Sequence, residues 1–334
     1  MFAMFSKEAL NVAAIGCVST SSSSTRKTGN HLWAERFDKP VADLFDMQDE
    51  IVARLASQLG TQLIEAEARR AQRAPHPDSM DLYFQGMVWF NKGMTPESLA
   101  QARAYFERAL ALDSDNVEAL VGTASVDTWA GGLLFSADKA ERLATAEAAL
   151  TKALSMAPEH PLAHAWMGGV LLFRGHADQS IAEYERALVL DPNLAAAHAY
   201  IGAAKYYIGR GEETERHVLE ALRLSPRDSY AYVWIGSAGT IKVSLGQYED
   251  AIVWLRRGIE ANRNFPLAHF FLGAALAQLG RMDEAKAAVR AGLALYPTFT
   301  VRHYSAGFSG DNPIYRAQRE RSIEGLRKAG VPEG

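Results

Sequence analysis

Apolar and small residues recur at a fixed interval of 34 positions through the second half of this 334-residue chain. The clearest unit runs from Pro161 to about Leu194. It has one apolar stripe before Gly175 and another after it, which predicts two helices joined by a turn. A period of this length predicts a stack of repeats, and therefore an extended binding surface rather than an enclosed pocket. The interval is kept by three prolines and by the alanine five residues before each, at Ala153, Pro158, Ala187, Pro192, Ala221 and Pro226.

Outside the repeats, the pattern of polar and apolar positions changes. The first 30 residues end in a run of serine and threonine that favours no folded element. Residues 31–37 alternate apolar and polar side chains, which predicts a short strand, and residues 41–73 carry a helical apolar stripe. After residue 297 the interval is lost. The chain is therefore predicted to comprise a disordered leader (1–30), a strand with a long helix (31–75), six repeats (80–297) and a capping helix with a tail (298–334).

Four positions of the clearest unit carry residues of a known pattern. Gly168, Ser180, Ala187 and Pro192 stand at its eighth, twentieth, twenty-seventh and thirty-second positions, and this arrangement resembles the tetratricopeptide repeat (TPR). Small residues at the eighth and twentieth positions let the two helices of a pair approach closely. The resemblance extends over about two thirds of the chain. It implies an all-α solenoid, a right-handed superhelix of helix–turn–helix pairs.

Net charge, the length of apolar runs and the number of cysteines limit the classes of function that are expected. The net charge of −4 supplies no basic field, so we expect no nucleic-acid partner. The sequence has no run of 18 apolar residues, which predicts no membrane-spanning helix and a cytoplasmic protein. Cys17 is the single cysteine, so neither an internal disulfide nor a thiolate metal cluster is expected. The residues up to it loosely resemble a lipoprotein cleavage site, so an envelope lipoprotein anchored through Cys17 is the alternative.

Three histidines are the strongest candidates for a metal site. His164, His198 and His269 occupy the same position in three repeats. Packed helices lie about 8–10 Å apart, whereas a zinc–nitrogen bond measures about 2.0–2.1 Å. Equivalent positions should therefore not converge on one ion, and we expect a packing role, no metal and no cofactor. Nucleophile, phosphate-loop and zinc-protease motifs are absent from the sequence, so no catalytic residue is predicted.

The TPR resemblance also implies where a ligand binds. In TPR proteins, five positions of each first helix line the concave face, and here these positions are apolar and aromatic. The lysine and asparagine that clamp a carboxylate in the family's chaperone-tail binders are missing. We therefore expect an extended or helical protein or peptide segment as the ligand. The alternative is that some of the aromatic residues pack between repeats. The predicted groove residues are Leu162, Ala165, Leu172, Phe173, Tyr206, Tyr207, Tyr230, Trp234 and Phe270.

A second resemblance concerns residues 28–73. The stretches 28–38 and 43–52 resemble the segment before the repeats in bacterial class III adenylate/guanylate cyclase-like and winged-helix TPR regulators. In those proteins the segment ends an α/β domain similar to the amino-terminal domain of TolB. The rest of that domain is missing from this sequence, as is the cyclase domain with its metal-binding aspartates. The resemblance therefore implies a remnant of an α/β domain before the solenoid, and no cyclase activity.

Three hypotheses for the function follow. The favoured one is a non-catalytic TPR scaffold that binds a protein or peptide segment on its concave face in bacterial signalling. The second is the regulatory part of an adenylate cyclase system, in which catalysis needs a partner polypeptide. The third is an envelope TPR lipoprotein. A lone strand at 31–37 would also expose an unpaired edge, so homo-oligomerisation through residues 31–73 is a further hypothesis.

Overall fold

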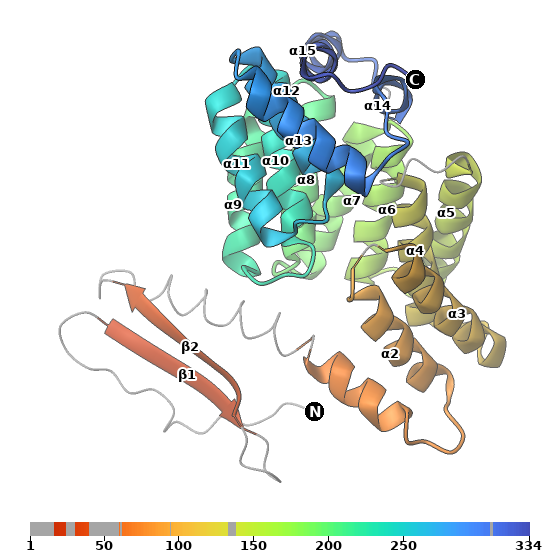
Figure 1. Ribbon diagram of the computed structural model, residues 1–334. Helices are drawn as coiled ribbons and strands as arrows, with labels where there is room; N and C mark the ends of the chain where they lie inside the picture. Colours follow the sequence, from red (N-terminus) through yellow and green to blue (C-terminus); the bar gives the residue numbers. More distant parts are fainter. Residues whose placement is uncertain are drawn as a thin grey trace. The chain divides into compact units, whose positions relative to one another are not determined.

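Figure 1 shows the computed structural model, in which the chain divides into two compact units, 1–66 and 67–334. Each unit is described by itself. The described residues are 17–24, 31–39, 60, 62–93, 95–132, 138–307 and 310–334.

The first unit contains an antiparallel pair of strands, β1 (Cys17–Ser24) and β2 (His31–Lys39), with Cys17 opposite Lys39. β2 covers the strand predicted at 31–37. β1 lies inside the segment predicted to be disordered, and that part of the prediction is corrected. Its run of serines gives no alternation from which a strand could be recognised. Residues 62–71 are helical, whereas residues 40–59 of the predicted long helix lie outside the described residues.

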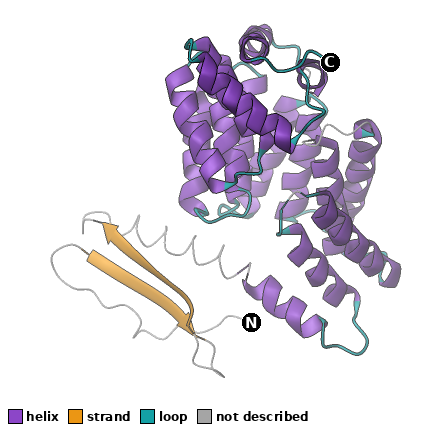
Figure 2. Ribbon diagram, viewed as in Figure 1, coloured by secondary structure: helices purple, strands orange, loops and turns teal. Residues whose placement is uncertain are grey.

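The second unit is built from pairs of helices (Figures 1 and 2). The described residues contain six pairs, and in each the two helices are neighbours in sequence and in space. The pairs are α2 (Ser79–Phe90) with α3 (Pro96–Leu112), α4 (Val117–Gly132) with α5 (Lys139–Met156), α6 (Pro161–Phe173) with α7 (Ala177–Leu190), α8 (Ala195–Tyr207) with α9 (Thr214–Leu224), α10 (Ala231–Leu245) with α11 (Tyr248–Ala261), and α12 (Pro266–Gln278) with α13 (Met282–Leu295).

The turn inside a pair depends on a glycine in the left-handed backbone region. Gly175, between α6 and α7, has a φ of 86°, which side chains other than glycine rarely adopt. The next amide, that of His176, donates a hydrogen bond of 2.9 Å to the carbonyl oxygen of Leu171. This bond satisfies a carbonyl group at the end of α6, so the helix stops and the chain reverses.

The two helices of a pair approach closely because small residues face each other. A Cβ atom at Gly168 of α6 would lie 3.1 Å from the backbone carbonyl oxygen of Ser180 on α7. The Ser180 hydroxyl in turn donates a hydrogen bond of 2.7 Å to the Gly168 carbonyl oxygen. Thr214 makes the same bond, of 2.8 Å, to Gly202 in the next pair. The twentieth position of the repeat therefore contributes a hydrogen bond as well as its small volume.

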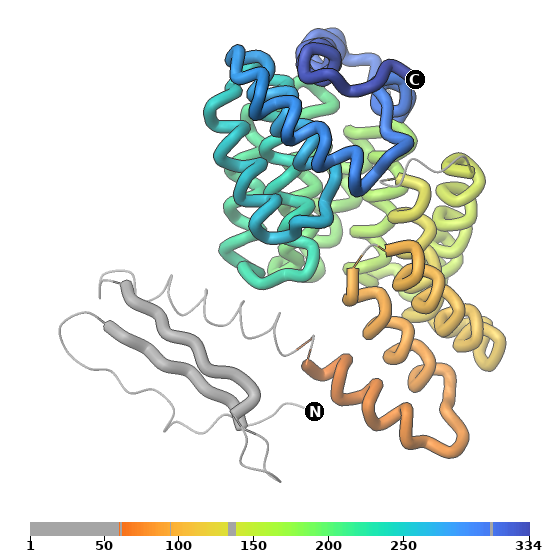
Figure 3. The backbone as a smooth tube through the Cα atoms, viewed as in Figure 1, coloured from red at the N-terminus to blue at the C-terminus, as the bar shows by residue number. Residues whose placement is uncertain are grey.

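The stack curves because its two layers of helices contact their neighbours differently. Successive first helices, such as α4 and α6 or α10 and α12, contact one another directly. Each second helix mainly contacts its own partner and the first helix that follows. The first helices therefore line the inner side of the curve, whose path can be followed in Figure 3. The predicted fold class, an all-α solenoid of helix–turn–helix pairs, is confirmed.

The C-terminal end of the stack is covered by the segment that leads into α14 (Val301–Gly307). Phe299 stacks on Phe270 of α12 with ring centroids 4.1 Å apart, and Tyr304 of α14 meets Phe271 edge-on at 5.2 Å. All four rings are buried. These rings cover part of the apolar end of the last pair, and Ile323, Leu326 and Ala329 of the final helix, α15 (Pro313–Ala329), join the same cluster.

Candidate protein-binding surface

The inner surface is made by the first helices α2, α4, α6, α8, α10 and α12, which carry most of the residues predicted to form the groove. Eight of the nine predicted residues lie on α6, α8, α10 or α12, and Tyr230 is the N-cap of α10. Three parts of this surface differ in what occupies them. One part is filled by an aromatic cluster, one is covered by α15, and one borders an open cleft at the start of α4, α6 and α8.

The aromatic cluster consists of rings from five of the helix pairs. Trp129 stacks on Tyr230 with centroids 5.4 Å apart, and it meets Trp166 and Tyr200 edge-on at 5.9 and 6.2 Å. Phe90 contacts Trp166 and Tyr230 at 5.9 and 5.8 Å. The Tyr230 hydroxyl also donates a hydrogen bond of 2.6 Å to the backbone carbonyl oxygen of Phe90. These rings occupy one another's faces, where a ligand's side chains would otherwise pack.

Four of the nine predicted groove residues are buried, which corrects their assignment to an open groove. Phe270 fits against Gly292 of α13 and under the segment before α14, so it is a core residue. These four residues pack between elements of the chain, as the alternative hypothesis expects. The exposed fractions are 5% for Leu172, 5% for Tyr206, 2% for Trp234 and 0% for Phe270.

The other five predicted residues are partly exposed: Leu162, Ala165, Phe173, Tyr207 and Tyr230. The structure does not bring them together in one groove. Phe173 packs against Gly132 of α4, and Ala165 packs against the cluster that contains Tyr184. Tyr230 belongs to the aromatic cluster, and Tyr207 contacts Tyr315 of α15. Leu162 alone of the nine lines the open cleft.

Helix α15 covers the part of the inner surface formed by α8, α10 and α12. Near its start, Tyr315 meets Tyr206 edge-on with centroids 5.1 Å apart and lies 5.0 Å from the ring of Tyr207. Near its end, a Cβ atom at Gly325 would lie 3.1 Å from the Cβ of Ala274 on α12. An aromatic contact at one end and a close approach of small residues at the other therefore position the helix.

A buried chain of hydroxyl groups joins α15 to the C-terminal end of α10. The hydroxyl groups of Ser322 and Ser244 are 2.7 Å apart, and Tyr206 donates a hydrogen bond of 2.9 Å to the Ser244 oxygen. Burial raises the pKa of the Tyr206 hydroxyl well above its usual range, so it remains a donor at neutral pH. Gln318 lies on the same face of α15, and its side-chain carbonyl oxygen is buried without a hydrogen-bond partner.

Donors on and beside α15 also reach the C-terminal ends of other helices. Arg321 donates to the carbonyl oxygen of Ser244 at 3.3 Å, and Asn312 donates to that of Ile208 at 3.0 Å. Arg319 donates to two carbonyl oxygens of α14, at 2.9 and 2.7 Å. The last carbonyl groups of a helix lack partners within it and carry partial negative charge. The surface therefore favours cationic and amide donors.

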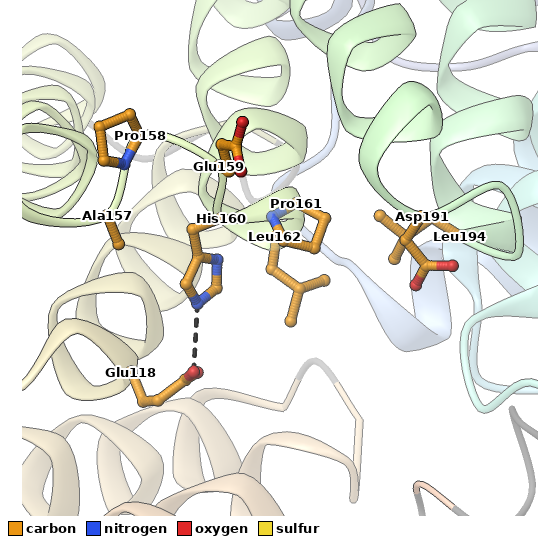
Figure 4. Close-up of a pocket in the computed structure, with 9 residues that line it drawn as sticks. All are labelled: Glu118, Ala157, Pro158, Glu159, His160, Pro161, Leu162, Asp191 and Leu194. Atoms are coloured by element: carbon orange, nitrogen blue, oxygen red, sulfur yellow. Dashed lines mark hydrogen bonds and ion pairs between the residues drawn. The ribbon is translucent and has the colours of Figure 1, made fainter.

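The open cleft lies where α4, α6 and α8 begin, and its volume is about 830 Å³. His160, the N-cap of α6, accepts a hydrogen bond from the Ala163 amide through Nδ1, so its Nε2 carries the proton that faces Glu118 Oε1 at 3.1 Å. This hydrogen bond lowers the pKa of the Glu118 carboxyl. Figure 4 shows the His160 ring directed at Glu118, with Leu162 beside it. The cleft is lined by Glu118, Ala157, Pro158, Glu159, His160, Pro161, Leu162, Asp191 and Leu194.

The three repeated histidines share one structural role. The rings of His164 and His269 each contact the backbone carbonyl oxygen six residues earlier, at 2.9 and 3.0 Å. His198 makes the equivalent contact with Pro192, and burial lowers the pKa of its imidazole. In the described part of the chain, no group of three or more His, Cys, Asp or Glu side chains could hold a metal ion. Nor is any described helix long and apolar enough to span a membrane.

Sequence reasoning missed α15 as an occupant of the inner surface, and it missed the Glu118–His160 pair. A signal for α15 was present, because its buried positions follow a three-and-four spacing that includes polar residues. A signal for His160 was its place directly before Pro161, which is the position of a helix cap. The approach of Glu118 to His160, 42 residues apart, follows only from how the pairs stack.

Comparisons with known proteins agree with this architecture. Family models of the tetratricopeptide repeat match residues 136–195, 239–280 and 267–299. The crystal structure of the APC/C hetero-tetramer Cut9-Hcn1 is similar, with a TM-score of 0.58 and 14% identity, over 78% of this chain and 46% of that one. A monomeric mutant of IFIT1 with Gppp-AAAA has a TM-score of 0.57 and 16% identity, over 86% of this chain and 69% of that one. At these identities the likeness concerns the fold.

One curated relative shares part of the sequence. A protein of Rhizobium meliloti (strain 1021) named "Putative adenylate cyclase 3" is 34% identical over 91 residues. The match covers 26% of this chain and 15% of the relative's length. Residues 136–195 and 239–299 therefore carry tetratricopeptide repeats, and repeats of this kind support the architecture of a protein-interaction scaffold.

Proposed function

We propose that this chain is a non-catalytic scaffold that binds a segment of a partner protein on its inner surface, within bacterial signalling in the cytoplasm. One observation carries the proposal: the surface of α8, α10 and α12 already holds a helix, α15. The helix is bound by ring contacts, by a close approach of small residues and by hydrogen bonds. These contacts are the kinds that bind helices of other proteins in grooves.

The open cleft supports the proposal because it offers a second contact for such a segment. Its wall combines apolar side chains, Leu162 and Leu194, with the carboxylates of Glu118, Glu159 and Asp191. Among the described residues, no lysine or arginine lines the cleft. A segment with apolar and basic side chains matches this lining better than an acidic segment or a nucleic acid does.

A photocrosslinking experiment in the native host tests the proposal. A photoreactive amino acid replaces Leu162 in the full chain, and in a second chain it replaces Val189, which is 72% exposed on α7. We expect a discrete protein adduct from position 162 that position 189 does not give. The substitution Leu194→Asp should remove it. Aspartate is a favoured N-cap residue, so α8 keeps its start while the cleft wall becomes polar. Equal adducts from both positions would contradict the proposal.

The second candidate, the regulatory part of an adenylate cyclase system, is favoured by the partial identity to the Rhizobium meliloti relative. In this case the partner protein supplies catalysis and the scaffold binds it. The purified chain should then form no cyclic nucleotide from ATP with Mg²⁺ or Mn²⁺ when alone. Cyclic nucleotide made by the chain alone would contradict both candidates.

A further inference from the structure

α15 binds to the stack in a way that a simple end cap would not. At the apolar end of the last pair, Phe299 and Tyr304 pack on Phe270 and Phe271, and Leu326 of α15 joins the same cluster. α15 also extends beyond this end: it contacts the first helices α12 and α10 more extensively than it contacts the second helix α13, and it reaches Tyr206 on α8. It therefore crosses three repeats along the inner surface. We call the part of α8, α10 and α12 that it covers the α15 site.

The contacts at the α15 site have the character of an exchangeable interface. The buried residues of α15 include polar ones, Gln318 and Ser322, and the Gln318 carbonyl oxygen makes no hydrogen bond in its buried position. An unpaired buried acceptor weakens an interface, because its hydration is lost without replacement. Ile323, Leu326 and Ala329 of α15 pack into the apolar cluster of the last pair. Gln318 and Ser322 add polar groups of the kind that interfaces which form and dissociate contain.

The α15 site also specifies the chemistry of its occupant. It requires an aromatic ring against Tyr206, a hydroxyl group at Ser244 and a small residue against Ala274. It presents the Ser244 carbonyl oxygen at the C-terminal end of α10, which Arg321 satisfies, and α14 beside the site presents carbonyl oxygens that Arg319 satisfies. α15 itself carries five basic and two acidic residues. A basic amphipathic helix therefore fits the site both by shape and by charge.

We infer that the α15 site is a receptor for a basic amphipathic helix of a partner protein, which α15 occupies in cis until that helix displaces it. This inference rests on the proposed function and adds the class of partner and its regulation. An occupant on the same chain acts at an effective concentration of the order of millimolar. The apparent affinity for a partner helix is therefore reduced by the fraction of chains in which α15 is displaced.

A disulfide lock tests whether α15 blocks the site. The full chain carries Cys17→Ser, Ala274→Cys and Gly325→Cys. The Cβ separation of 3.1 Å at this pair is within a few tenths of an ångström of the lower end of the disulfide range, about 3.5 Å. The probe is a fluorescein-labelled synthetic peptide with the sequence of residues 311–331. A further substitution, Tyr315→Ala, weakens the attachment of α15 to the stack at the end of the helix that is remote from the disulfide.

We expect the peptide to bind the reduced Tyr315→Ala chain at least 10-fold more tightly than the oxidised chain, as measured by fluorescence anisotropy. A peptide with Arg319→Glu and Arg321→Glu should bind the reduced chain at least 10-fold more weakly than the native peptide. If the disulfide does not form, the peptide's affinity for the Tyr315→Ala chain is compared with its affinity for the unsubstituted chain. Tighter binding to the Tyr315→Ala chain is then the expected result. Circular dichroism checks that each chain retains its helices.

Two results would overturn the inference: equal binding to oxidised and reduced chains, or no binding to the reduced Tyr315→Ala chain. Either result leaves the proposed function standing if photocrosslinking at Leu162 still gives its specific adduct, because the cleft lies outside the α15 site. If that adduct is also absent, the proposed function fails together with the inference.

Discussion

The hydroxyl group of Tyr230 donates a hydrogen bond of 2.6 Å to the backbone carbonyl oxygen of Phe90, although 140 residues separate them in sequence. Contacts in a repeat array usually join only adjacent repeats. Here the first and the fifth pair meet on the inner side of the curve, and Trp129 stacks on Tyr230 between them. The first five pairs are therefore coupled to one another beyond their nearest neighbours.

Tyr230→Phe should weaken this coupling while keeping the ring contacts. Loss of the hydrogen bond is expected to reduce the free energy of unfolding by about 0.5–1.5 kcal/mol. Tyr230→Ala also removes the ring and should reduce it by about 3–5 kcal/mol. Urea unfolding measures both values. Hydrogen exchange should show α2 and α10 losing protection together in Tyr230→Ala, and loss confined to α10 would contradict the coupling.

Ser180→Ala tests the hydrogen bond inside a helix pair. The Ser180 side chain is fully buried, and its hydroxyl donates to Gly168 across the pair. Its removal leaves a buried carbonyl group with one fewer donor, so a loss of about 1–3 kcal/mol in unfolding free energy is expected. Ser155→Ala is the matched control, because that hydroxyl bonds to Lys152 on an exposed surface. Equal effects of the two substitutions would show that small volume alone matters at Ser180.

Stability should fall as the pH is lowered through the range in which His217 titrates. Burial, together with the nearby charges of Lys205 and Arg216, lowers the pKa of this imidazole from 6.5 to about 4. The unfolded chain therefore binds a proton between these values that the folded chain does not, so protonation favours unfolding. The contribution of the neutral His217 imidazole to the free energy of unfolding is complete above pH 6.5 and is lost as the pH falls toward 4. In thermal unfolding, His217→Phe should show a smaller decrease in Tm between pH 7 and pH 5.

The buried face of α15 should dominate its attachment to the stack. Leu326 is fully buried against the last pair, whereas Ile314 is 54% exposed on the same helix. Leu326→Ala should reduce the free energy of unfolding by about 2–5 kcal/mol, and Ile314→Ala by less than about 0.5 kcal/mol. Limited proteolysis should cut α15 faster in the first variant only. Similar cutting of both variants would place the binding face of α15 elsewhere.

The repeats could be predicted from the sequence because their signals are local. Turn glycines such as Gly175 have the positive φ that the turn requires, and small residues such as Gly168 lie where helices cross. β1 could not be predicted, because its serines carry no alternating pattern. The buried stripe of α15 was harder to recognise despite its helical spacing, since two of its positions are the polar residues Gln318 and Ser322.

The candidate surface was harder to predict than the fold, because it depends on contacts between distant segments. Periodicity places Phe270 and Tyr206 on first helices, but it does not reveal that Phe299 and Tyr315 cover them. Similarly, no pattern along the chain indicates that Tyr230 reaches Phe90. Which residues remain accessible is therefore a property of the folded stack, and Leu162 is the predicted residue that lines its open cleft.

The residues of α15 that contact the stack can serve as a query for finding its partner. Tyr315, Gln318, Ser322, Leu326 and Ala329 are separated by two, three, three and two residues, and all are buried. A helix from another protein of the same cell that carries an aromatic, a hydroxyl, an aliphatic and a small residue at this spacing, with arginines one and three residues before the hydroxyl, would be a competitor for the same contacts. The terminal helix thus contains, in its own sequence, a template from which the unknown ligand can be sought.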